Sequence, residues 1–134
     1  MPIKSSKTPL KLFPLWLLLG VGLIALVIFL SLTPKPPDLV DFTDGDKVGH
    51  ALAYAALMGW FGQLYRGRWP LALFALGFVF LGVLMEYFQL WGGVRDFQYG
   101  DMVADTFGVV LGWILTASVF KGTLVWLENK LGLG

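Results

Sequence analysis

Nine polar side chains that could take part in chemistry stand within the apolar stretches of this sequence or in the short segments that join them. They are Asp46, Lys47, His50, Tyr54, Glu86, Gln89, Arg95, Asp101 and Asp105. Histidine and carboxylate side chains can act as general acids and bases, and arginine can bind a phosphate or carboxylate through paired hydrogen bonds. The candidate catalytic residues are therefore His50, Glu86, Asp101 and Asp105. The other five are candidate ligand-binding residues.

The same acids and histidine could also hold a hard divalent cation. The sequence contains no His-Glu-x-x-His or other metal-binding motif, so we assign no metal and leave the cofactor open. It also contains no cysteine, which excludes disulfides, thiol nucleophiles and cysteine-ligated zinc. The formal net charge of +1 gives no reason to expect a nucleic-acid partner.

The composition is that of a membrane protein. Of the 134 residues, 57% are hydrophobic and 14% are charged. Soluble globular domains have about 45–50% and about 25%. A domain of this length leaves much of its surface exposed, so it could not hide this apolar excess from water. We expect one all-α, polytopic membrane domain over residues 1–134.

Four apolar stretches are long enough for transmembrane helices, which need about 20 mostly apolar residues. They cover about 12–34, 46–65, 70–90 and 100–120. The first follows a basic flank, as in a signal peptide, but its apolar part is too long and no clear cleavage site follows. Gly92-Gly93 should end the third helix. The tail, 121–134, is expected to be a frayed extension or an interfacial helix.

The basic residues predict how these helices are oriented. With four spans and a cytoplasmic N-terminus, seven of the ten basic residues are cytoplasmic. These are Lys4, Lys7, Lys11, Arg66, Arg68, Lys121 and Lys130. The positive-inside rule favours this orientation over its inverse. We therefore expect both termini in the cytoplasm.

This topology places all nine polar residues near the extracytoplasmic face. Helical spacing puts His50 and Tyr54 on one face of the second helix, and Asp101 and Asp105 on one face of the fourth. Glu86 lies more than one turn inside the third helix. A charge within a span costs at least a few kcal/mol, so it needs a partner, a water-filled cavity or a function. The sequence therefore predicts one polar site in the outer layer.

Several of these residues also have a purely structural interpretation. Asp46 and Asp101 could cap helix N-termini, where a negative charge is favoured. Lys47 could extend to the membrane interface. Tyr54 could be an ordinary residue of the bundle, and Gln89 could join two helices by a hydrogen bond. These alternatives stay open from the sequence alone.

A Gly-x-x-x-Gly motif, Gly108 and Gly112, lies on the same helix face as the two acids of the fourth span. Small residues at this spacing let another helix approach closely. We expect internal packing, with Ala51 and Ala55 of the second helix as the complementary surface. An oligomer formed through the same glycines is the alternative.

The ordered set of motifs resembles the VanZ-like family, whose founding member is associated with teicoplanin resistance. The motifs are Asp46-Lys47-x-x-His50-x-x-x-Tyr54, Glu86-x-x-Gln89 and Arg95-x5-Asp101-x3-Asp105-x-x-Gly108-x3-Gly112. They span residues 46–112, half of the chain. The resemblance implies a small helical protein of the bacterial cytoplasmic membrane. It also implies shared positions at Asp46, Lys47, His50, Glu86, Gln89, Arg95 and Asp101. This chain departs from the family in having Asp105 where asparagine is usual.

Two classes of function fit this pattern. In the first, the polar site binds or transforms a membrane lipid, a lipid-linked envelope precursor or a glycopeptide, and it could be the active site of a hydrolase or transferase. In the second, the site is a hydrogen-bonded network that fixes the helix packing, and the protein organises the cell envelope. A channel or carrier is disfavoured, because the polar residues stop at the outer layer.

Overall fold

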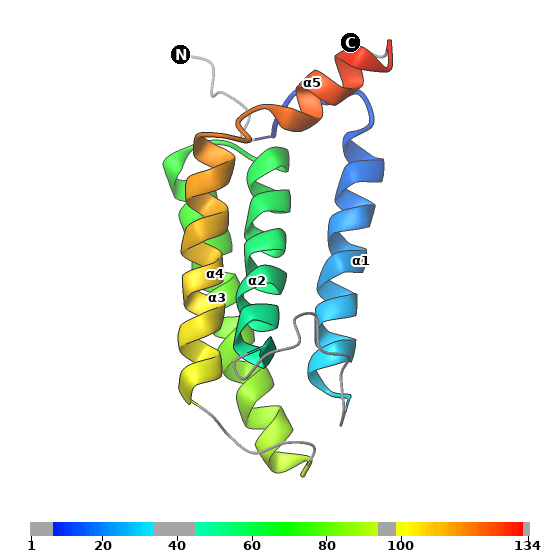
Figure 1. Cartoon of the computed structure of the whole chain (residues 1–134). Coiled ribbons are helices and arrows are strands. Elements are labelled where there is room, and N and C mark those ends of the chain that lie inside the picture. Colours follow the sequence, from blue (N-terminus) through cyan, green and yellow to red (C-terminus); the bar gives the residue numbers. More distant parts are fainter. Residues whose placement is uncertain (1–6, 34–44, 94–98, 133–134) are drawn as a thin grey trace.

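The computed structural model describes residues 7–33, 45–93 and 99–132, without the side chains of residues 45 and 46. These residues form five α-helices, shown in Figure 1, and no β-strand occurs among them. The helices are α1 (Phe13–Ser31), α2 (Gly45–Leu64), α3 (Arg68–Trp91), α4 (Tyr99–Ala117) and α5 (Thr123–Lys130). The predicted all-α fold is therefore confirmed.

Three of the described helices, α1, α3 and α4, are long and apolar enough to cross a membrane. Their length and composition are consistent with a multi-pass membrane protein. The predicted helix limits agree with the structure to within three residues at each described end. The end expected from the Gly92-Gly93 pair is also correct, since α3 finishes at Trp91 and Gly93 has a φ of +65°.

The second predicted span is present as helix α2, but α2 is less apolar than α1, α3 and α4. Its position explains the difference. Helix α2 contacts α1, α3 and α4, and Figure 1 shows it between α1 and the α3–α4 pair. Side chains such as Tyr54, Leu57 and Met58 are buried by protein. A helix enclosed by other helices can carry polar residues that a lipid-facing helix could not.

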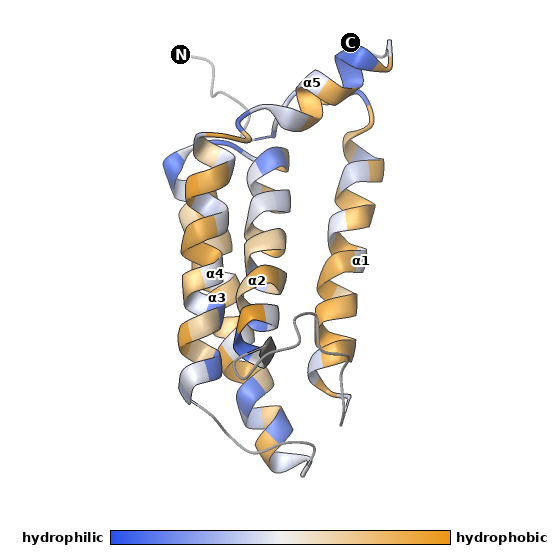
Figure 2. Ribbon diagram, viewed as in Figure 1, coloured by the Kyte–Doolittle hydropathy of each residue, from blue (hydrophilic) through white to orange (hydrophobic). Residues whose placement is uncertain are grey.

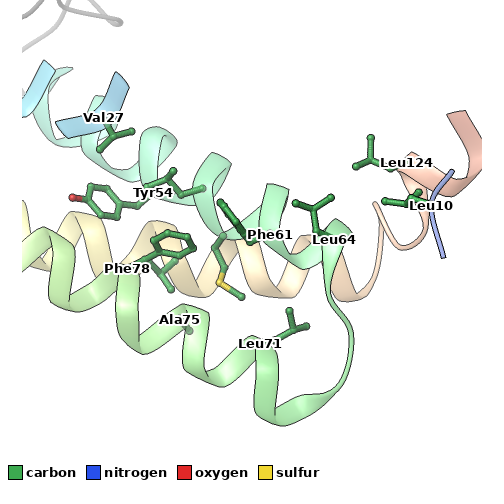
Figure 3. Close-up of a cluster of buried hydrophobic side chains, with 12 residues drawn as sticks. Leu10, Val27, Tyr54, Phe61, Leu64, Leu71, Ala75, Phe78 and Leu124 are labelled. Atoms are coloured by element: carbon green, nitrogen blue, oxygen red, sulfur yellow. The ribbon is translucent and has the colours of Figure 1, made fainter. Parts of the chain in front are cut away.

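The apolar core lies between α2 and its neighbours, towards the end of the bundle where α5 lies (Figure 3). Phe61 of α2 stacks on Phe74 of α3 with ring centroids 5.0 Å apart and packs against Phe78 at 5.5 Å. Figure 2 shows hydrophilic segments of α2, α3 and α4 at the opposite end. The end of the bundle away from α5 is the one at which Glu86, Asp101 and Asp105 are buried, and we call it the polar end.

Helices α2 and α4 share the most extensive helix–helix contact, and this contact depends on glycine. A Cβ atom added at Gly108 would lie 2.2 Å from the backbone oxygen of Ala51. One added at Gly112 would lie 2.5 Å from the backbone oxygen of Ala55. The Gly-x-x-x-Gly motif therefore packs against the two predicted alanines of the same chain.

The tail forms a short helix, α5, that lies across the start of α1 (Figure 1). The backbone N–H groups of Lys11 and Leu12 donate to the Glu128 carboxylate over 2.7 and 2.8 Å, and the Trp16 indole donates over 2.8 Å. Free N–H groups at a helix start attract a negative charge. Glu128 therefore caps α1 from the other end of the sequence.

Candidate functional site

Three helices bring four ionisable side chains together at the polar end of the bundle. His50 lies in the first turns of α2, Glu86 in the last third of α3, and Asp101 and Asp105 in the first turns of α4. We call these four residues the polar cluster. Helices α2 and α3 follow each other in the chain and run in opposite directions, so the C-terminal part of α3 lies beside the start of α2. The three acids are almost fully buried, with exposed fractions of 0%, 5% and 2% for Glu86, Asp101 and Asp105.

His50 links the two acids of α4. Its Nδ1 atom lies 2.8 Å from Asp105 Oδ1, and its Nε2 atom lies 3.8 Å from Asp101 Oδ2. An ionised carboxylate only accepts hydrogen bonds, so when Asp105 is ionised the proton of the neutral imidazole lies on Nδ1. In the neutral imidazole, the lone pair of Nε2 then faces Asp101.

Glu86 completes the polar cluster from α3. One ligand atom each from His50, Glu86 and Asp101 lies within 4.8 Å of the others. The charges of all three acids of the cluster act on the His50 ring. The cluster is therefore one electrostatic unit and not a set of separate polar residues.

Lys47 is the described basic side chain closest in sequence to the polar cluster. Its Nζ atom lies 3.5 Å from Asp101 Oδ1, and its side chain is about one-third exposed. Gly100 makes room for it, since a Cβ atom at that position would lie 2.7 Å from Lys47 Cε. Lys47 therefore balances part of the negative charge from the outer edge of the cluster.

Two further predicted residues border the polar cluster with buried polar atoms. Tyr54 is 2% exposed, and its hydroxyl has no hydrogen-bond partner among the described residues. The charges of Asp105 and Glu86 act on this hydroxyl, and Figure 3 shows it pointing out of the apolar cluster. Gln89 is fully buried and donates to the backbone oxygen of Ser31 over 2.6 Å, while its own side-chain oxygen has no described hydrogen-bond partner.

Seven of the nine predicted site residues are therefore described, and they lie towards one end of α2, α3 and α4, with Tyr54 near the middle of α2. These are Lys47, His50, Tyr54, Glu86, Gln89, Asp101 and Asp105. Arg95 and the side chain of Asp46 lie outside the described residues, so their places in the site stay predictions.

Sequence reasoning missed Gly82, which shapes the site. A Cβ atom at this position would lie 2.6 Å from Asp105 Oδ2. Glycine therefore lets the Asp105 carboxylate rest against the backbone of α3. The signal was present in the spacing, because Gly82 precedes Glu86 by one turn and so shares its helix face.

Chemically, the polar cluster can bind a cation, exchange a proton through His50, or hold a polar group that enters from the outer edge. Carboxylates and an imidazole serve all three purposes. Its burial in a body of apolar helices is the feature that distinguishes it from an ordinary surface cluster. No protein-family model, curated protein or solved structure matches this chain.

Proposed function

We propose that this chain is a VanZ-like protein of the bacterial cytoplasmic membrane that binds the polar head of an envelope lipid or lipid-linked wall precursor at the extracytoplasmic face. The observation that carries the proposal is the burial of Glu86, Asp101 and Asp105 together at one end of an apolar bundle. Buried acids at membrane depth are costly, so their presence in one cluster indicates a function.

The lipid part of this proposal is supported by the surface next to the polar cluster. A shallow apolar groove on α3 and α4 is lined by Val83, Met102, Val103, Thr106 and Phe107. Met102 directly follows Asp101, and Thr106 directly follows Asp105. An acyl chain in the groove would bring its headgroup to the polar end of the bundle.

The orientation is proposed from the charges of the sequence: four spans, both termini in the cytoplasm, and the polar cluster in the outer leaflet. Alkaline phosphatase is active only outside the cytoplasm. Fusions after Phe42 or Arg95 should be active, and fusions after Arg68 or Lys121 inactive. Reversed activities would place the polar cluster at the cytoplasmic face and overturn the proposed site of action.

The involvement in the glycopeptide response is proposed from the family resemblance, and teicoplanin susceptibility tests it. Cells that express the chain should differ in susceptibility from cells that lack it. Glu86→Gln and Arg95→Gln should accumulate in the membrane yet lose this difference. Glu128→Gln is the matched control, because it makes the same chemical change at the other end of the bundle.

A result in which both site variants keep the full susceptibility difference would remove the polar site from the function. If both variants are degraded and the double variant recovers, the two residues form a structural pair. Removing one partner of a truly buried ion pair costs about 3–5 kcal/mol, which is enough to explain such degradation.

The second candidate function is a membrane-embedded hydrolase or transferase acting on a lipid-linked substrate. The observation that favours it is the 2.8 Å contact between His50 Nδ1 and Asp105, because an oriented imidazole is a good general base. The purified chain would then release product from a lipid-linked phosphate, and His50→Gln would stop the release. Binding without turnover in the unchanged protein would reject this second candidate.

A further inference from the structure

We propose that His50, Glu86 and Asp101 bind one divalent first-row metal ion, such as Zn²⁺ or Mn²⁺, with Asp105 as the residue that orients the histidine ligand. One nitrogen and two carboxylate oxygens suit these ions better than Mg²⁺ or Ca²⁺, which prefer oxygen ligands alone. Neither a sequence motif nor a comparison with known proteins assigns a metal to this chain.

The distances fit a shared ion. Ligand atoms of the three residues lie within 4.8 Å of one another, and His50 Nε2 lies 3.8 Å from Asp101 Oδ2. Two donors about 2.1 Å from one ion are roughly 3.4 Å apart at a tetrahedral angle and roughly 4.2 Å apart on opposite sides. Small rotations of the three side chains therefore bring them to bonding distance.

Asp105 is placed as the carboxylate that orients a histidine ligand in many metal sites. Such ligands usually donate the N–H of the other ring nitrogen to a carboxylate, which fixes the ring and makes the ligating nitrogen more basic. Here Nδ1 meets Asp105 Oδ1 at 2.8 Å. The Nε2 lone pair then points to the side where Asp101 lies.

A second, independent observation comes from Tyr54. Its hydroxyl is buried and has no hydrogen-bond partner in the part of the chain that the structure describes. Helical side chains lean towards the N-terminus of their helix, and Tyr54 follows His50 by one turn. The carboxylates of Asp105 and Glu86 act on this hydroxyl. A water molecule on the proposed ion would supply the missing partner.

The test uses the full chain, purified without a histidine tag in detergent, stripped with a chelator and titrated with Zn²⁺ or Mn²⁺. We expect one equivalent of ion to bind. The chain has a single histidine, so a nitrogen coupling in the pulsed EPR spectrum of bound Mn²⁺ identifies His50 as the ligand. This measurement needs no variant, so it decides the question even if substitutions in the site prevent folding.

Variants then separate ligands from the orienting residue. Glu86→Gln and Asp101→Asn should weaken binding more than about 100-fold, which exceeds the usual loss for a supporting residue. Asp105→Ala should weaken it about 10- to 100-fold, and Asp105→Asn less, since an amide oxygen still accepts the Nδ1 proton. Glu128→Gln is the matched control, because it changes a buried carboxylate far from the cluster. This variant should bind the ion as the unchanged chain does.

Three results would overturn the proposal: no stoichiometric binding of either ion, bound Mn²⁺ without nitrogen coupling, or undiminished binding by both ligand variants. The metal site coincides with the site of the proposed function. Binding of the ion does not depend on that function, and only the side of the membrane from which the ion enters rests on it. Metal binding is measured on purified protein. Its failure would leave the susceptibility and fusion results standing, and their failure would leave metal binding standing.

Discussion

Replacing Gly108 by alanine should separate α2 from α4. The new methyl carbon would lie 2.2 Å from the Ala51 backbone oxygen, whereas ordinary contact begins at 3.4 Å. The helices would have to move apart by about 1.2 Å, because close-packed backbone has no free volume to absorb the methyl group. The obstacle is a backbone atom, so no side-chain rotation relieves it.

The magnitude follows from two opposing effects. Overpacking of a close contact costs about 1–3 kcal/mol, and the size of this overlap places the cost near the upper limit. Alanine regains about 1 kcal/mol in a helix relative to glycine. We therefore expect Gly108→Ala to lower the free energy of unfolding by about 2 kcal/mol. The matched control is Gly77→Ala, where a Cβ atom meets nothing within 4 Å and stability should rise by up to about 1 kcal/mol.

The assay is equilibrium unfolding of the purified chain in mixed detergent micelles, followed by tryptophan fluorescence. Separation of α2 from α4 should also lengthen the contact of His50 with Asp105, and Gly108→Ala should therefore weaken the polar site as well as the fold. The reasoning is refuted if Gly108→Ala is as stable as Gly77→Ala. Equal stability would mean that the two backbones are not in contact at Gly108.

The remaining predictions concern the two ends of the bundle. At one end, burial raises the pKa of Glu128, but the hydrogen bonds from Leu12, Trp16 and Lys11, with the charge of Lys11, outweigh burial and hold the pKa below its ordinary 4.5. Its contribution to stability should be complete above about pH 4.5 and lost as the pH falls through the lowered pKa. Melting temperatures of the unchanged chain and of Glu128→Gln across the acidic range check this, and parallel curves would contradict it. At the other end, cysteines introduced at positions 50 and 101 of the cysteine-free chain should be joined by a short thiol reagent in membranes. Absence of that product would speak against the cluster.

The sequence alone determined the all-helical, membrane-type fold and the limits of its helices, because both depend on local properties. Runs of apolar residues and breakers such as Gly92-Gly93 act over a few positions along the chain. The grouping of polar residues at one end was also predictable. Consecutive helices that cross a membrane alternate in direction, so the starts of the second and fourth helices and the end of the third come to the same side. The spacing of Gly108 and Gly112 likewise indicated a close helix contact.

The contacts between helices were decided by the tertiary structure. Which His50 nitrogen meets Asp105 and which faces Asp101 depends on how α2 and α4 are rotated about their axes. The capping of α1 by Glu128 joins residues 116 positions apart and has no local signal in the sequence. Helical periodicity predicts the face of a helix on which a residue lies. Only the packing of the helices against one another decides what that face meets, because the rotation and separation of each pair depend on side chains of both.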